Sequence, residues 1–122
     1  MIKRLDTLDV ATADLDQAGA VYHQNYGFRI DHAAGADDAV ITIGDARIRL
    51  RSGAGAEAVL KSTGEGLAAI WLEADDVGPI QTALDAAGLK HHPLRHESDR
   101  RVLEMDPSAA NLVPLFIFDR RA

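Results

Sequence analysis

The chain opens with an alternation of apolar and polar residues that predicts a half-buried strand over residues 2–12. Apolar residues at helical spacing follow, and they predict a helix that begins after Asp14 and ends at Gly27. Asp14 is a favoured N-cap with Gln17 three residues later, and glycine is common just beyond a helix C-terminus. Three more strands are predicted before residue 52, at Phe28–His32, Ala39–Ile43 and Arg47–Arg51.

The same order of elements returns after a small, glycine-rich stretch over about residues 53–66, in which a short helical turn is predicted at Glu57–Lys61. The elements predicted there are a strand at Leu67–Ala74, a helix at Pro79–Ala87 ended by Gly88, and strands at Lys90–Leu94, Val102–Met105 and Leu112–Phe118. The two strand-helix units match at an offset of 61 to 62 residues with a single gap, which indicates an internal repeat.

The repeat predicts one α+β domain over residues 1–122. Its first module covers about 1–52, the linker about 53–66 and the second module about 67–119. Pro114 falls inside the last predicted strand, where it cannot donate a hydrogen bond to a neighbouring strand. We therefore expect an edge position or a bulge there.

Composition excludes several classes of protein. The 122 residues carry a net charge of −6, which has the wrong sign for binding nucleic acid through phosphates. The chain has no cysteine, so disulfides, thiolate metal sites and cysteine nucleophiles are excluded. It also has no apolar run of about 20 residues and no signal peptide at its start. We expect a cytoplasmic protein that binds neither nucleic acid nor membrane.

Three motifs within the repeat resemble the vicinal oxygen chelate superfamily, which includes glyoxalase I, extradiol dioxygenases, methylmalonyl-CoA epimerase and bleomycin-resistance proteins. They are Ala13-Asp14-Leu15-Asp16 before the first helix, Tyr22 with Gly27-Phe28 at its end, and Asp106-Pro107 with Asn111-Leu112 before the last strand. The resemblance implies two tandem βαβββ modules that form a cupped antiparallel or mixed sheet with helices on its convex face. Fold alone does not define function.

The resemblance also implies a divalent metal held by His or Glu side chains on the first and last strands of each module. The matching positions in this chain are Thr7, Arg49, Ala69 and Pro114. None of these side chains is a metal ligand. We therefore expect neither a metal nor any other cofactor.

A metal site could instead have moved to the polar segment that contains His91, His92, His96, Glu97 and Asp99. Adjacent histidines in a strand point to opposite faces, and the proline after them breaks any helix that would align them. We expect these histidines to be solvated residues of a strand and loop.

A stripe of arginines is the sharpest chemical signal. Arg47, Arg49 and Arg51 alternate with apolar residues, and the strand period places them on the face that the resemblance assigns to Thr7 and Asp9. The stripe is either a solvated sheet face or a surface that binds a carboxylate or phosphate. In the second case, Arg49→Ala is expected to weaken anionic ligands and leave stability nearly unchanged.

In the second module the same parity places Trp71 and Glu73 on one face, with Phe116 on the last strand. Trp71 is the only tryptophan, and it either stacks on a planar ligand or packs in the core or a dimer interface. The predicted ligand-binding residues are Thr7, Asp9, Arg47, Arg49, Trp71 and Phe116. The candidates for general acid-base work are Asp9, Glu73 and His96.

These observations predict a metal-free protein that binds a small anionic or aromatic ligand in a sheet-lined cup and is not an enzyme, with drug sequestration by bleomycin-resistance proteins as the nearest analogue. The alternative is a glyoxalase- or dioxygenase-type lyase, isomerase or oxygenase whose metal ligands lie elsewhere. A third interpretation is a structural or regulatory module whose cup is filled by its own side chains. We also expect a homodimer, because association would cover exposed strand edges.

Overall fold

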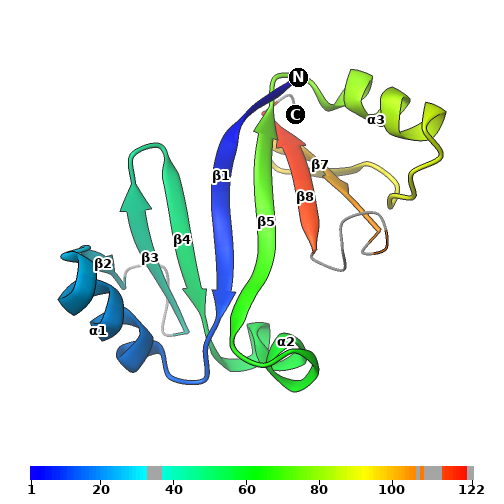
Figure 1. The fold of residues 1–122 in the computed structure, drawn as a ribbon. Helices are drawn as coiled ribbons and strands as arrows, with labels where there is room; N and C mark the ends of the chain where they lie inside the picture. Colours follow the sequence, from blue (N-terminus) through cyan, green and yellow to red (C-terminus); the bar gives the residue numbers. More distant parts are fainter. Residues whose placement is uncertain (33–36, 107, 109–113, 121–122) are drawn as a thin grey trace. The chain divides into compact units, whose positions relative to one another are not determined.

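The structure is a computed structural model that describes residues 1–32, 37–106, 108 and 114–120 (Figure 1). Its elements in chain order are β1 (Ile2–Ala11), α1 (Leu15–Tyr26), β2 (Ile30–Asp31), β3 (Asp38–Ile43), β4 (Ala46–Arg51), a 3₁₀ turn (Gly53–Gly55), α2 (Glu57–Ser62), β5 (Gly66–Ala74), α3 (Val77–Ala86), β6 (Arg95–Glu97), β7 (Arg100–Glu104) and β8 (Leu115–Asp119). The strands belong to one mixed sheet in the order β2-β3-β4-β1-β5-β8-β7-β6. The predicted α+β class with a mixed sheet is confirmed. No helix in the described ranges is long and apolar enough to cross a membrane.

The chain divides into two compact units. The N-terminal unit is Thr7–Ala68, and the C-terminal unit is Ala69–Ala122 together with Met1–Asp6. Strand β1 contributes its second half to the N-terminal unit and its first half to the C-terminal unit.

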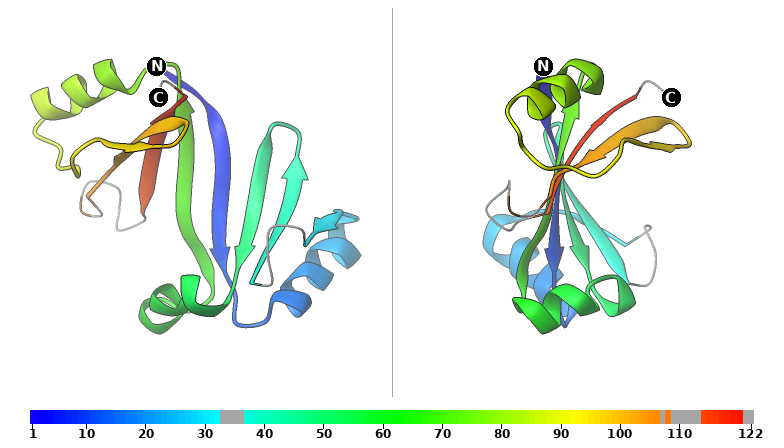
Figure 2. Two further views of the ribbon diagram at one scale, coloured as in Figure 1. Left: turned by 180° about the vertical axis from the view of Figure 1, so that it is seen from behind. Right: turned by 90° about the vertical axis from the view of Figure 1, so that its right-hand side faces the viewer.

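In the N-terminal unit, α1 covers one face of the strands, as the views from the front and from behind show (Figure 1, Figure 2). Strand β4 pairs in parallel with β1 and antiparallel with β3. The buried core between helix and strands contains Ala39, Ile41 and Leu50, against which Leu15, Ala18, Tyr22, Phe28 and Ile30 pack. The apolar residues that the alternation predicts to face a helix therefore do so.

Helix α1 begins and ends where its sequence predicts. The Asp14 side chain accepts a hydrogen bond from the Gln17 amide at 3.0 Å, and Gly27 closes the helix with a φ of 69°. A left-handed residue at this position is costly for any side chain except glycine. Both ends of the helix could be predicted from the sequence because each depends on residues only a few positions apart.

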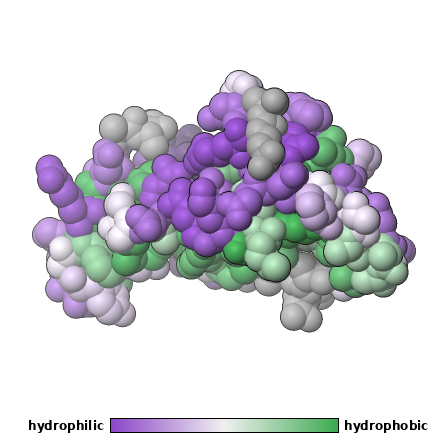
Figure 3. Space-filling model, turned by 90° about the horizontal axis from the view of Figure 1, so that it is seen from above, coloured by the Kyte–Doolittle hydropathy of each residue, from purple (hydrophilic) through white to green (hydrophobic). Residues whose placement is uncertain are grey.

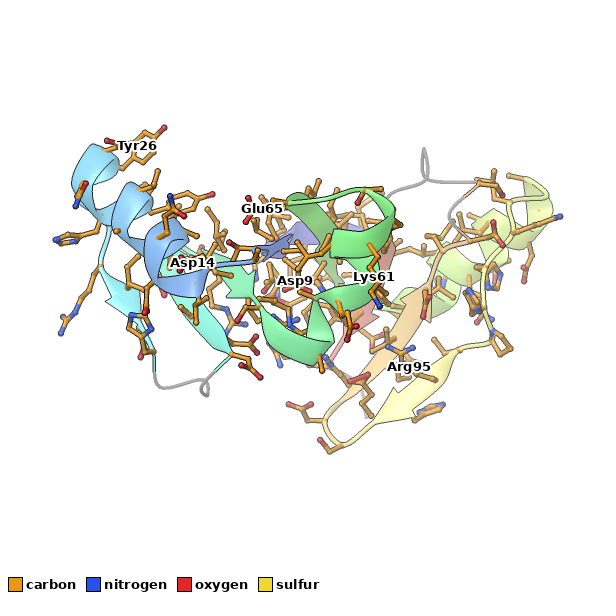
Figure 4. All side chains as sticks on the ribbon, turned by 90° about the horizontal axis from the view of Figure 1, so that it is seen from below. Asp9, Asp14, Tyr26, Lys61, Glu65 and Arg95 are labelled. Atoms are coloured by element: carbon orange, nitrogen blue, oxygen red, sulfur yellow. The ribbon has the colours of Figure 1, made fainter. Side chains whose placement is uncertain are left out.

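The segment between α2 and β5 holds the start of α1. Glu65 accepts hydrogen bonds from the Ala13 amide at 2.8 Å and from the Thr12 hydroxyl at 3.0 Å, close to the Asp14 cap (Figure 4). The Ala13 amide, with the Thr12 hydroxyl second, lowers the pKa of Glu65 below its usual value. The linker is thus fastened to the end of β1 by a carboxylate.

In the C-terminal unit, α3 packs on one face of β7 and β8 (Figure 2). Its core contains Ala74, Val77, Leu103 and Ile117, against which Leu72, Ile80, Leu84 and Leu94 pack. Helix α3 begins two residues earlier than predicted, because Asp76 caps it by accepting from the Gly78 amide at 2.9 Å.

Two predictions about the strands of this unit are wrong. The strand predicted at Lys90–Leu94 is a single bridge between His91 and Met105, and β6 begins only at Arg95. Pro93 lacks an N–H group and so interrupts regular pairing there. The edge position expected from Pro114 is also wrong, because β8 lies between β5 and β7.

Pro114 is tolerated because it lies just before β8, where only its carbonyl is needed; that carbonyl accepts from the Ile70 amide at 2.9 Å. Much of the predicted turn from Asp106 to Asn111 and the start of the strand predicted at Leu112–Phe118 lie outside the described residues. Within that turn, the Asp106 side chain accepts from the Ser108 amide and hydroxyl.

Candidate functional site

The face of the N-terminal unit opposite α1 carries the predicted polar residues. Thr7 lies beside Arg47 and Asp9 beside Arg49 in the β1–β4 register, so their side chains share one face. Val40 and Thr42 of β3 continue these two rows. The structure thus brings together the four ligand-binding candidates of this unit.

Arg49 is held by a neighbour on the same face. Its Nε and Nη2 atoms donate to the two carboxylate oxygens of Asp9 at 2.6 and 2.8 Å. Asp9 is only 3% exposed, so this is a largely buried two-bond ion pair. Arg49 therefore neutralises a buried carboxylate, and the expectation that Arg49→Ala leaves stability unchanged is reversed.

The remaining arginines of the stripe differ in their surroundings. Arg51 pairs with Asp38 at 3.4 Å across β3 and β4. Arg47 is exposed and lies beside the exposed hydroxyl of Thr42. Arg47 is the most exposed residue of the three.

The face of the C-terminal unit opposite α3 is aromatic. Trp71 and Phe116 are register partners on β5 and β8, and their rings stack with centroids 4.2 Å apart and planes 11° apart. Phe118, which is fully buried, meets the Trp71 ring edge-on at 6.3 Å. None of the three rings belongs to the core under α3; Trp71 and Phe116 are partly exposed and Phe118 is fully buried.

Three arginines cover these rings. The guanidinium of Arg100 lies 4.8 Å from the Trp71 centroid and 5.1 Å from that of Phe118. Arg95 lies 5.8 Å from Phe116, and Arg120 lies 5.4 Å from Phe118. We call Trp71, Phe116, Phe118 and these three arginines the aromatic face.

Sequence reasoning missed the arginines of the aromatic face. Arg95 and Arg100 belong to a hairpin, β6–β7, whose first strand was predicted too early in the chain. With the hairpin in the correct register, alternation along β7 would have placed Arg100 on the same face as Glu104. The alternation along β7 is present in the sequence, but it could be used only once the register of the hairpin was known.

Glu73, a catalytic candidate, is buried beside the aromatic face. Its carboxylate accepts from Arg4 Nε at 2.7 Å and lies 3.5 Å from Arg120. Arg4 also contacts Asp6 at 3.4 Å. Arg4 is therefore the β1 residue that reaches Glu73.

The third catalytic candidate, His96, is not brought to this group. It is the register partner of Arg101, whose side chain bonds Asp119 and Asp76 on the α3 side. Strand geometry then places His96 on the face opposite Trp71 and Phe116. Asp9 and Glu73 belong to different units, and each is already paired with arginine.

The side chains of His91 and His92 contact different acidic residues. His91 Nε2 lies 2.6 Å from Asp85 Oδ1 on α3, and its Nδ1 lies 2.8 Å from the His92 carbonyl oxygen. His92 Nε2 lies 3.6 Å from Glu104 on β7. Because both ring nitrogens of His91 face acceptors, the backbone carbonyl of His92, followed by Asp85, raises the pKa of His91 above its usual value.

A pH dependence of stability follows from His91. A folded-state pKa above the unfolded value of about 6.5 means that protonated His91 stabilises the fold fully below pH ~6.5, and that this contribution is lost as pH rises through the folded pKa. The loss of melting temperature caused by His91→Ala should therefore be larger at pH 5.5 than at pH 8.5. An equal loss at both pH values would contradict a protonated His91 in the folded state.

The metal positions implied by the resemblance do not fit a divalent cation. The Arg49 guanidinium has no lone pair to offer, Ala69 and Pro114 have no side-chain donor, and Thr7 alone is no ligand set. Among the described residues, no group of three or more His, Asp or Glu side chains is arranged to hold a metal. These four positions therefore do not provide a binding site for a catalytic metal.

The two strand-helix modules and their shared mixed sheet define the vicinal oxygen chelate fold. The same fold is found in methylmalonyl-CoA epimerase in complex with methylmalonyl-CoA and NH4+, with a TM-score of 0.75 and 21% identity over 100% of this chain and 97% of that one. Methylmalonyl-CoA epimerase from Mycobacterium tuberculosis gives 0.74 and 21%, covering 99% and 90%. Hypothetical protein BH1468 from Bacillus halodurans C-125 gives 0.74 and 13%, covering 98% and 95%. No family model and no curated protein matches the sequence. At these identities the likeness shows the fold.

Proposed function

We propose that this protein binds a small planar organic molecule that carries a carboxylate or another anionic group. The observation that supports this most is the stacked pair of Trp71 and Phe116 on the face opposite α3, with Arg100 lying over the Trp71 ring. Aromatic rings bind planar ligands by stacking, and guanidinium groups bind carboxylates through two hydrogen bonds.

The arginines of the aromatic face can change partners at low cost. Arg100 pairs with Glu97 at 3.0 Å, and Arg95 pairs with Glu97 at 3.2 Å and Glu104 at 3.1 Å. All four side chains are between 28% and 47% exposed, and such ion pairs contribute about 0–1 kcal/mol. A ligand carboxylate can therefore replace Glu97 as the partner of Arg100 without a large loss of stability.

Intrinsic fluorescence tests the proposal, because Trp71 is the only tryptophan. Titration with a planar aromatic carboxylate such as 2-naphthoate is expected to quench or shift Trp71 emission with saturation. The variant Arg100→Ala should bind about tenfold more weakly, the equivalent of one hydrogen bond to a charged group.

Lys61→Ala is the matched control, since Lys61 makes an exposed ion pair with Glu57 on α2. It removes one positive charge, as Arg100→Ala does, and its affinity for the carboxylate should equal that of the unaltered protein. Equal weakening in both variants would reduce the effect to net charge and would count against the aromatic face as the binding surface.

Thr7, Asp9, Arg47 and Arg49 stay predicted ligand contacts on the open face of the N-terminal unit. Arg47 is the most exposed of the four residues. A homodimer also stays a prediction. It is supported by exposed apolar side chains such as Ile2 and Leu67, which association would cover.

The proposed protein works without a divalent metal, and its nearest functional analogue is ligand sequestration of the bleomycin-resistance type. The support is the donor set at Thr7, Arg49, Ala69 and Pro114. Elemental analysis of protein purified without chelator is expected to find far less than one zinc, iron, nickel, cobalt or manganese ion per chain. About one ion per chain would contradict the metal-free proposal and favour an enzyme.

The second candidate function is that of an isomerase, supported by the full-length likeness to methylmalonyl-CoA epimerases. Glu73 is its best candidate base, since it is buried beside the aromatic face. Incubation with methylmalonyl-CoA in D2O separates the two functions. Deuterium incorporation that is lost in Glu73→Gln would support the isomerase, and its absence together with naphthoate binding would support the binding protein.

A further inference from the structure

One acidic side chain bridges two arginines of the aromatic face. Glu97 Oε1 accepts a hydrogen bond from Arg95 Nε at 3.2 Å, and Glu97 Oε2 accepts one from Arg100 Nε at 3.0 Å. The two oxygens of one carboxylate are thus bound by two different guanidinium groups. Among the residues that the structure describes, no other acid pairs with two arginines of this face. Glu97 therefore holds the position in which the carboxylate of a ligand would contact both arginines.

This position lies close to the stacked rings. The guanidinium of Arg100 lies 4.8 Å from the centroid of the Trp71 ring, and that of Arg95 lies 5.8 Å from the centroid of Phe116. A carboxylate bound by these two arginines is therefore near both rings. A molecule that carries a carboxylate directly on a planar ring can contact the arginines and the rings at the same time.

Glu97 can leave its position by rotation of its side chain alone. It is the last residue of β6 and the register partner of Arg100, across the turn formed by Ser98 and Asp99. The side chain of Glu97 is 34% exposed, and exposed ion pairs of this kind contribute little to stability. The hydrogen bonds that Glu97 loses on leaving are replaced by water.

The other two glutamates near the rings are less suited to such an exchange. Glu73 accepts from Arg4 at 2.7 Å and its side chain is only 7% exposed, so a rotation would separate a buried charge from its partner. Glu104 pairs with one arginine of the aromatic face and also lies 3.6 Å from His92. Glu97 is therefore the acid that a ligand carboxylate would replace.

We propose that Glu97 competes with the ligand for Arg95 and Arg100: its carboxylate occupies the position of the ligand carboxylate in the free protein and is displaced on binding. This inference rests on the proposed function. Its consequence is that the free protein binds an anionic ligand more weakly than the two arginines alone would allow, because only the fraction of molecules in which Glu97 has turned away can bind.

Glu97→Gln is expected to tighten the binding of 2-naphthoate about fivefold, as measured by Trp71 fluorescence. Glutamine has the size of glutamate but no charge, so it competes less well for the guanidinium groups. The neutral 2-naphthamide is the matched ligand, since it has the same rings without the charge. Its affinity should be equal in the two proteins, and an equal gain for both ligands would overturn the proposal.

Asp99→Asn is the matched control variant, because Asp99 lies on the same hairpin and pairs with Arg120 at 3.7 Å. It removes the same charge as Glu97→Gln and should change the affinity for 2-naphthoate less than about twofold. Equal gains in the two variants would indicate attraction to net charge and would contradict a specific role of Glu97.

The pKa of Glu97, followed by NMR of its carboxyl carbon, is a second measurement. In the free protein, partial burial raises this pKa, but the hydrogen bonds and charges of Arg100 and Arg95 lower it more, so that it lies below its usual value. Saturation with 2-naphthoate should raise the pKa toward the usual value, because the displaced carboxylate loses both donors. An unchanged pKa at saturation would show that Glu97 keeps its arginines and would overturn the proposal.

The two proposals fail in different ways. If 2-naphthoate binds neither the unaltered protein nor Glu97→Gln, the proposed function is wrong, and the role of Glu97 is wrong with it. If 2-naphthoate binds both with the same affinity, the proposed function stands and only the competition by Glu97 is wrong.

Discussion

Replacing Asp119 by asparagine is expected to lower the free energy of unfolding by about 3 kcal/mol. Asp119 is fully buried at the end of β8. Its carboxylate accepts from the Val77 amide at 2.8 Å and from Nε of Arg101 at 3.1 Å, and it also bonds Nη2 of Arg101. An asparagine of the same size presents an NH2 group where one of these acceptors was, so a buried donor loses its partner.

The effect should extend to α3, because Arg101 also donates to the Asp76 side chain that caps this helix. Urea denaturation measures the loss. Asp99→Asn is the matched control, since Asp99 is 71% exposed and lies 3.7 Å from Arg120; it should change stability by less than about 0.5 kcal/mol. Similar losses of unfolding free energy in the two variants would show that the buried hydrogen bonds of Asp119 do not stabilise this unit.

The second large effect is expected in the N-terminal unit, where Arg49→Ala should cost about 2 kcal/mol of unfolding free energy. The substitution leaves the buried Asp9 carboxylate without its two-bond partner. Removing one member of a buried pair costs more than this, but the Arg49 side chain is 33% exposed and water partly replaces it.

A double-mutant cycle checks the explanation. Asp9→Asn combined with Arg49→Ala should lose about 1 kcal/mol less than the sum of the two single losses. Arg51→Ala on the same strand is the control, because its partner Asp38 lies at 3.4 Å and is 22% exposed; its cost should stay below about 1 kcal/mol. Additive losses for Asp9 and Arg49 would mean that the pair does not stabilise the unit.

Local signals in the sequence predicted much of the fold. The cap at Asp14, the left-handed Gly27 and the alternation along Arg47–Arg51 each depend on residues a few positions apart, and the structure has each of them. The parity argument also placed Trp71 with Phe116 correctly, because a parallel pair of strands keeps alternation in step.

Contacts between distant residues were not readable in the same way. Arg4 and Glu73 are 69 positions apart, and Arg49 and Asp9 are 40 apart. These long-range ion pairs decide whether an arginine on the sheet can bind a ligand or instead neutralises a buried carboxylate. The candidate site could therefore be assigned to faces of the sheet from the sequence, but the role of each charged side chain could not.

The face of the molecule in Figure 3 has a mixed surface. Hydrophilic residues dominate much of the view in Figure 3, with hydrophobic residues between them. Tyr26, which is 65% exposed, points away from the C-terminal end of α1 (Figure 4). Its ring centroid lies 5.6 Å from that of Phe28 and 6.3 Å from that of Tyr22, so Tyr26 belongs to a small aromatic cluster at the end of α1.

The division of β1 between the two units has a consequence for dissecting the protein. Residues Met1–Asp6 belong to the C-terminal unit. The Asp75 amide donates a hydrogen bond to the Met1 carbonyl, and Arg4 donates one to the Glu73 carboxylate. A C-terminal fragment that begins at the linker would lack this segment, so we expect it to fold less stably than the same unit in the full chain. An N-terminal affinity tag would be attached to the C-terminal unit, because that unit contains Met1–Asp6. To restore the complete unit, a C-terminal fragment would have to be mixed with a peptide of residues 1–6.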